Sequence, residues 1–130
     1  MEVRSLSRFL EGRMRAEDLA GEIQDEVRRY QEGLNRTGTS VPVLLVGDHG
    51  QLEVRASSLL LICEAFLSHG FSRWDVHYVC DALTLSEATF TSERVRELLE
   101  ELANPEIRAE QLSKREVLSV HDELVALGGE

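Results

Sequence analysis

Ser72–Leu85, with the sequence SRWDVHYVCDALTL, decides the fold of this chain. At 3.6 residues per turn, the stretch forms one helix with apolar side chains on two sides. One side carries Val76, Val79, Cys80 and Leu83. The opposite side carries Trp74, Tyr78, Asp81 and Leu85. A helix that is apolar on two sides lies either at the centre of a core or beneath a bound partner.

The segments on either side of this stretch also predict helices. Leu59–Leu67 is apolar except at Glu64, which is typical of a buried helix. Further along, a charged segment carries a narrow apolar stripe formed by Val95, Leu98, Leu99 and Leu102. We expect these three helices to form the core of a single domain that spans residues 1–130.

The N-terminal third predicts a short helix and a long one. Leu6–Leu10 is helical in pattern and is closed by Gly12. Ala16–Leu34 has an apolar stripe with a helical period, so it predicts one continuous helix. Near the other end of the chain, Ser113 and Glu116 form a capping box that opens a last helix.

The middle of the chain predicts a β-hairpin. Val43–Gly47 and Leu52–Ala56 read as strands, and Asp48–Gln51 reads as the turn between them. The predicted fold is therefore mainly α, a compact domain of five to six helices with one small antiparallel hairpin at about 43–56. The alternative is an α+β fold.

Charge and hydropathy limit the function. The 130 residues carry a net charge of −10, which argues against binding nucleic acid or an anionic membrane. The same charge favours either a basic partner or solubility alone. The chain has no apolar run of 18 residues, and its first residues lack the apolar block of a signal peptide. We therefore expect a cytoplasmic protein.

No motif in the chain predicts catalysis. Cys63, His69, His77 and Cys80 could be considered as zinc ligands, but their spacing is poor for a structural zinc site. His121-Asp122 resembles part of a phosphohydrolase metal site without its further ligands. We expect no metal, no cofactor and no enzymatic activity, and we expect the cysteines to be buried as thiols.

Two groups of residues are candidates for partner binding. The first is a stripe of carboxylates on the outer side of the predicted Ala16–Leu34 helix: Asp18, Glu22, Asp25 and Glu26. Like charges four residues apart mildly destabilise a helix, which a binding role would explain, although a solvated face is the alternative. The second group is Trp74, Tyr78 and Asp81, which form either part of the core or a surface anchor. We expect Trp74 to belong to the core.

Two patterns resemble small bacterial immunity proteins of polymorphic-toxin and colicin-like systems. The first is Phe9–Gly12 followed by Met14–Leu19. The second is Trp74-x-x-x-Tyr78-Val79-x-Asp81-Ala82-Leu83-x-Leu85, followed by Phe90 and by Asn104-Pro105-Glu106-Ile107. The chain departs from these patterns at three places. Arg15 replaces the capping Ser of the pattern, Asn104 replaces its Asp, and Arg108-Ala109 replaces its Asn-Gly.

The resemblance implies a non-enzymatic protein that binds and neutralises a cognate toxin, with a basic toxin domain as the partner. The protein would act as a monomer or a homodimer. An acidic chaperone or adaptor that binds an effector segment is the second hypothesis, and a small hydrolase is the third. The neighbouring gene separates these hypotheses, because it would encode a toxin, a secreted effector or a metabolic enzyme, respectively.

Overall fold

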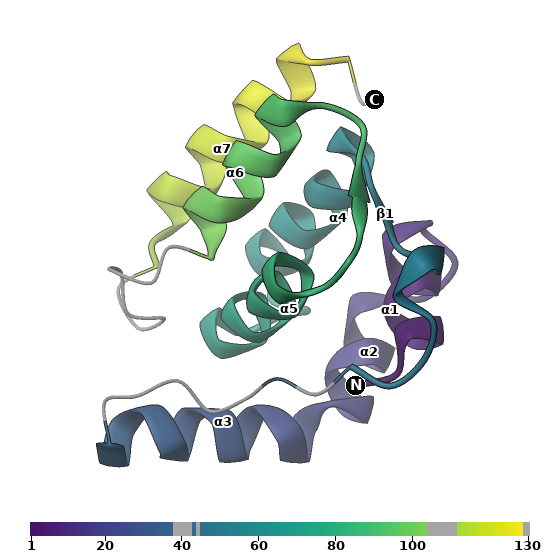
Figure 1. Cartoon of the computed structure of the whole chain (residues 1–130). Helices are drawn as coiled ribbons and strands as arrows, with labels where there is room; N and C mark the ends of the chain where they lie inside the picture. Colours follow the sequence, from purple (N-terminus) through teal and green to yellow (C-terminus); the bar gives the residue numbers. More distant parts are fainter. Residues whose placement is uncertain (38–42, 44, 104–111, 129–130) are drawn as a thin grey trace.

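The computed structural model describes residues 1–37, 43, 45–103 and 112–128. This part of the chain is mainly helical, as predicted, with a small two-stranded sheet (Figure 1). The elements in chain order are α1 (Val3–Leu10), α2 (Ala16–Glu22), α3 (Gln24–Thr37), η1 (His49–Gln51), β1 (Glu53–Val54), α4 (Ala56–Leu67), α5 (Arg73–Leu85), β2 (Thr89–Phe90), α6 (Glu93–Leu102) and α7 (Lys114–Ala126). No helix in the described ranges is long and apolar enough to cross a membrane.

Helix α5 begins as its sequence predicts. The Ser72 side chain accepts a 3.1 Å hydrogen bond from the Asp75 backbone N–H, and the Asp75 carboxylate accepts one of 2.8 Å from the Ser72 backbone N–H. These two bonds satisfy N–H groups that the first turn of a helix leaves without partners. The predicted core side of α5 is buried: Val76, Val79, Cys80 and Leu83.

The other helices enclose α4 and α5. Helix α4 packs mainly on α7 and α1, while α5 packs mainly on α6 and α3. In Figure 1, α6 and α7 run side by side, and α3 crosses the opposite end of the molecule. Leu59 and Ile62 of α4 and Leu98 of α6 are fully buried in a cluster that includes side chains from all seven described α-helices. The fold is therefore held mainly by apolar burial between helices.

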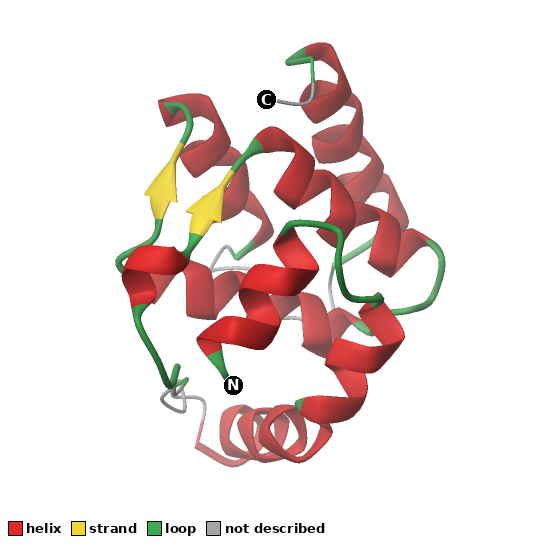
Figure 2. Ribbon diagram, turned by 90° about the vertical axis from the view of Figure 1, so that its right-hand side faces the viewer, coloured by secondary structure: helices red, strands yellow, loops and turns green. Residues whose placement is uncertain are grey.

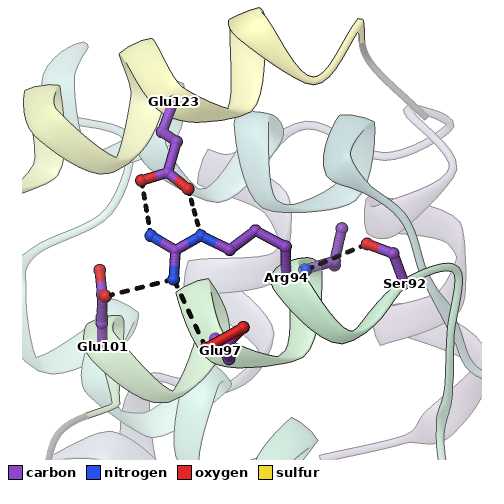
Figure 3. Close-up of polar contacts among 6 residues, drawn as sticks. Ser92, Arg94, Glu97, Glu101 and Glu123 are labelled. Atoms are coloured by element: carbon purple, nitrogen blue, oxygen red, sulfur yellow. Dashed lines mark hydrogen bonds and ion pairs between the residues drawn. The ribbon is translucent and has the colours of Figure 1, made fainter.

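Helices α6 and α7 are also joined by an ion pair (Figure 3). Arg94 donates hydrogen bonds from Nε and Nη2 to the two carboxylate oxygens of Glu123, with Nη2 at 2.6 Å from Oε1. Glu97 and Glu101 lie 3.7 and 3.8 Å from Arg94 Nη1. The hydrogen bond from Arg94 lowers the pKa of Glu123. Two-pronged pairing of this kind fixes the relative position of two helices better than a single contact does.

The predicted antiparallel hairpin is wrong. His49–Gln51 forms a short 3₁₀ helix, and the Asp48 side chain accepts a 2.9 Å hydrogen bond from the Gly50 backbone N–H. Strand β1 pairs in parallel with β2, with Glu53 opposite Thr89 (Figure 2). Parallel strands need a long crossover, and here α4 and α5 provide it. Val46 makes only an isolated bridge to Glu2, and residue 44 lies outside the described residues.

The predicted continuous helix from Ala16 to Leu34 is also interrupted. Helix α2 ends at Glu22, and α3 begins at Gln24. Ile23 lies between them with φ −99° and ψ 7°, and its side chain is buried. Leu19 of α2 and Val27 of α3 lie on either side of the break, and both are buried in the core.

In the turn between α4 and α5, the residue in the left-handed backbone conformation is a histidine and not the glycine beside it. His69 has φ +67°, a conformation that favours glycine, whereas the neighbouring Gly70 does not have a positive φ. A Cβ atom on Gly70 would lie 3.1 Å from the Cβ of Ala16 and 3.0 Å from the Glu17 carboxylate. Gly70 therefore allows the start of α2 to approach closely, and His69 adopts the left-handed conformation.

Candidate functional site

Several of the predicted binding residues meet between α3 and α5. The Tyr30 hydroxyl donates a 2.6 Å hydrogen bond to Oδ2 of Asp81. The Tyr78 hydroxyl donates one of 2.9 Å to Oε1 of Glu26. The same Glu26 oxygen pairs with the Met1 ammonium group. Glu26, Tyr78 and Asp81 therefore form polar contacts that fasten α3 and the N-terminus to α5.

Tyr30 is the centre of this contact, and its role could not be seen in the sequence. Its side chain is only 1% exposed. Its ring meets Tyr78 edge-on at 5.2 Å between centroids and Trp74 at 6.4 Å, and it lies 5.8 Å from the His77 ring. Tyr30 lies within the Ala16–Leu34 segment, whose apolar stripe predicted a helix, but nothing in the sequence identified Asp81 as the partner of its hydroxyl group.

Burial governs the ionisation of these groups. Desolvation, together with hydrogen bonds to Asp81 and Glu26, raises the pKa of Tyr30 and of Tyr78 above ordinary values. Desolvation lowers the pKa of His77, although the nearby Asp81 charge opposes this effect. The two hydroxyls and the imidazole are therefore neutral at pH 7, as buried groups that stabilise the fold would be.

The acidic stripe is divided by the break at Ile23. Asp18, Glu22 and Asp25 are exposed, and we call these three residues the α2–α3 acidic face. Asp18 pairs with Arg15 at 3.3 Å, and Asp25 pairs with Arg28 at 2.6 Å. Exposed pairs of this kind are weak and can exchange for a partner's charges. Glu26 does not belong to this face, because its carboxylate is directed to Tyr78 and Met1.

Trp74 lines a groove with Arg28, the ion-pair partner of Asp25 in the acidic face. It is partly buried and packs against the core, while Tyr78 is 3% exposed and lies within it. A groove of about 450 Å³ runs between α2–α3 and the start of α5. Its lining comprises Ala20, Gly21, Gln24, Val27, Arg28, Gln31, Ser72, Trp74 and Asp75. We call it the Trp74 groove. Leu85, predicted to share a face with Trp74, is 70% exposed and stands apart from these contacts.

A larger groove of about 710 Å³ lies between the end of α1, β1 and α4. Arg55 and Glu53 form an ion pair of 2.9 Å at its edge, and Arg13 and Glu11 form one of 3.5 Å. Glu64 also lines this groove and lies 3.9 Å from Nε2 of His121. Because charges of both signs are paired along its walls, the groove does not favour a ligand of either sign.

The cysteines and histidines do not gather into a reactive centre in the described part of the chain. No three His, Cys, Asp or Glu side chains there could hold a metal ion together. Cys63 and Cys80 are buried free thiols. Burial raises the pKa of Cys63 to about 12 and raises that of Cys80 well above its ordinary value. Thiols of this kind are poor nucleophiles at neutral pH.

No protein-family model, curated protein or solved structure matches this chain. One piece of the immunity-protein pattern, Asn104–Ile107, lies outside the described residues, as do Arg108 and Ala109. The fold and the site define a mainly helical protein with a partly buried polar contact between α3 and α5. Arg28 connects the exposed acidic face to the Trp74 groove, because it lines the groove and pairs with Asp25.

Proposed function

We propose that this protein binds a basic protein partner in the cytoplasm and neutralises it, as the resemblance to immunity proteins implies. The observation that carries the proposal is the position of Trp74. Its partly buried side chain lines the Trp74 groove together with Arg28, which pairs with Asp25 of the α2–α3 acidic face. Interfaces draw much of their binding energy from such aromatic residues, and charged residues around them select and steer the partner.

The electrostatics of the whole chain support a basic partner. The net charge is −10, and the three carboxylates of the acidic face lie on adjacent turns of α2 and α3. Asp75 adds a further carboxylate at the edge of the Trp74 groove. A surface with this distribution attracts cationic proteins and accelerates their association at low ionic strength.

The buried contacts explain how the acidic face would be held ready for binding. Tyr30–Asp81 and Tyr78–Glu26 are hydrogen bonds between α3 and α5, and α3 carries Asp25. A face fixed before binding loses less conformational entropy when the partner arrives. In this proposal Glu26, Tyr78 and Asp81 position the surface, and they do not contact the partner.

The proposal is tested by affinity capture from a lysate of the source cells. The wild type is compared with Glu22→Lys/Asp25→Lys and with Glu87→Lys/Glu100→Lys, which makes the same charge change at exposed residues elsewhere. We expect the wild type and the control variant to retain a basic protein at low salt, and the first variant to lose it. Co-expression with the wild type should then relieve that protein's toxicity.

Two results would contradict this function. One is a partner retained equally by all three proteins, which would show that the acidic face is only a solvated surface. The other is an unfolded effector segment retained regardless of salt, which would favour the adaptor hypothesis.

A further inference from the structure

Helix α3 is anchored to the core by few side chains. Among the side chains described for this helix, those of residues 24–33, only Val27 and Tyr30 are buried. The helix packs mainly on α5 and α2, and it crosses the end of the molecule opposite to α6 and α7 (Figure 1). An element with few buried contacts opens locally, at a lower free energy than global unfolding requires. We therefore expect α3 to detach from α5 without unfolding of the whole domain.

The anchor Tyr30 covers a histidine of α5. The rings of Tyr30 and His77 lie 5.8 Å apart between centroids. The same tyrosine ring meets Trp74 and Tyr78 edge-on, at 6.4 and 5.2 Å. Its hydroxyl donates a hydrogen bond of 2.6 Å to Asp81, one turn beyond His77 on α5. Because Tyr30 lies against His77, docking of α3 removes water from the imidazole.

The charges around His77 come from α3 and α5. On α5, Asp81 follows His77 by one turn and Arg73 precedes it by one turn. On α3, Glu26 is directed to Tyr78. In the described part of the chain, Asp81 is the one charge that acts on the ionisation of His77. Its attraction for an imidazolium is weaker than the cost of burying that cation, so the pKa of His77 lies below its ordinary value.

The detached state therefore binds a proton more readily than the docked state does. An exposed histidine has a pKa of about 6.5, whereas His77 beneath Tyr30 has a lower pKa. Lowering the pH thus favours detachment of α3, and the effect begins near pH 6.5, where the exposed imidazole binds its proton. If the docked imidazole stays neutral, the ratio of detached to docked α3 rises by at most about 30-fold between about pH 7.5 and pH 5.

We propose that His77 is a pH-sensitive switch, and that its protonation releases α3 from α5 while the rest of the core stays folded. Release separates Tyr30 from α5. It also opens the Trp74 groove, because α3 supplies Val27 and Arg28 to that groove, and it moves Asp25 of the acidic face. The switch does not depend on the proposed protein partner. If that partner exists, it binds more weakly at acidic pH.

Hydrogen exchange of backbone amides, followed by NMR between about pH 7.5 and pH 5, tests the switch. The exchange rates are converted to protection factors, which removes the direct effect of pH on the exchange chemistry. The amides of α3 report on its docking, and those of α4 and α6 report on the global fold. The experiment uses the protein alone.

His77→Phe is the test variant, because it keeps a ring against Tyr30 and cannot bind a proton. His77→Gln is a second variant with a smaller side chain. His121→Gln is the matched control, because it removes a partly buried histidine from α7, at the other end of the molecule (Figure 1).

We expect the α3 amides of the wild type to exchange at least about tenfold faster than those of α4 and α6 at pH 7.5. Their protection should fall by about a further tenfold at pH 5, within the 30-fold limit of about one bound proton. The control His121→Gln should behave as the wild type does. The two His77 variants should keep the α3 protection that they have at pH 7.5.

Three results would contradict the switch. Equal protection of α3, α4 and α6 at every pH would show that α3 opens only when the whole domain unfolds. Protection of α3 that does not change with pH would show that docking leaves the ionisation of His77 unchanged. An equal loss of α3 protection in the wild type and in both His77 variants would assign the proton to another group.

Discussion

The Tyr30 hydroxyl on α3 lies 2.6 Å from Oδ2 of Asp81 on α5, which joins residues 51 positions apart in the sequence. Helix α3 packs mainly against α5 and α2, and this bond is one of the specific links between α3 and the rest of the core. It fixes the helix that carries Asp25 of the acidic face.

Replacing Tyr30 by Phe should lower the free energy of unfolding by about 1–3 kcal/mol. The ring contacts stay, but the partly buried Asp81 loses its hydrogen-bond donor. Urea denaturation of Tyr30→Phe, Asp81→Asn and the double variant gives the coupling between the two side chains. If the two single effects add without coupling, the hydrogen bond does not stabilise the fold.

The stability of the protein should fall as the pH decreases below about 6.5. Desolvation lowers the pKa of His77 in the fold, so the unfolded chain binds a proton more readily than the folded chain does. The stabilising effect of the neutral imidazole is complete above the ordinary pKa of about 6.5, and it is lost as the pH falls through the lower folded value. The slope for one proton reaches at most about 1.4 kcal/mol per pH unit.

Urea unfolding of the wild type and of His77→Gln between pH 7 and 5 measures this effect. Asp81 is the charged neighbour and Tyr30 the neutral one, and both remain in the variant. The variant should show a flatter dependence of stability on pH in this range. Identical pH profiles would mean that His77 titrates equally in the folded and unfolded chains.

Replacing His69 by Gly should stabilise the fold by about 0.5–1 kcal/mol, because glycine adopts a positive φ without strain. Thermal melting of the wild type and of His69→Gly measures this effect. A loss of stability would show that the His69 side chain stabilises the turn by contacts stronger than the strain.

Replacing Gly70 by Ala should destabilise the protein by about 1–3 kcal/mol. The added Cβ would press against the Ala16 Cβ at 3.1 Å, at the start of α2. Gly21→Ala is the matched control, because a Cβ there meets nothing within 4 Å and Ala is the better helix former. Equal melting temperatures for the two variants would mean that α2 can move away from the added Cβ with no loss of stability. The close approach at Gly70 would then be unimportant.

The helices could be predicted where local signals define them. Ser72 and Asp75 begin α5 by bonds within four residues of chain, so the sequence alone contains the information. The buried side of α5 followed from its helical period in the same way. The break at Ile23 could not be predicted, because the apolar stripe continues through it from Leu19 to Val27 without any local signal that ends a helix.

The sheet and the site depend on contacts between distant residues. Glu53 pairs with Thr89, which follows it in the chain after two helices. The sequence instead predicted pairing with the nearby segment Val43–Gly47. The carboxylates of the acidic stripe were found by their spacing, but nothing local shows that Glu26 is directed to Tyr78 and Asp81 to Tyr30. Which charges remain exposed is decided only when α3 packs on α5.

The most direct test of the proposed function is the salt dependence of affinity for the captured basic partner, measured by isothermal titration calorimetry. The proteins are the wild type, Glu22→Lys/Asp25→Lys and the control Glu87→Lys/Glu100→Lys. We predict that wild-type affinity falls steeply as salt is raised, and that reversal of Glu22 and Asp25 weakens binding by at least about tenfold at low salt while the control stays within about twofold of the wild type. Affinity that is independent of salt, or equal for the two charge-reversed proteins, would contradict a role of the α2–α3 acidic face in binding.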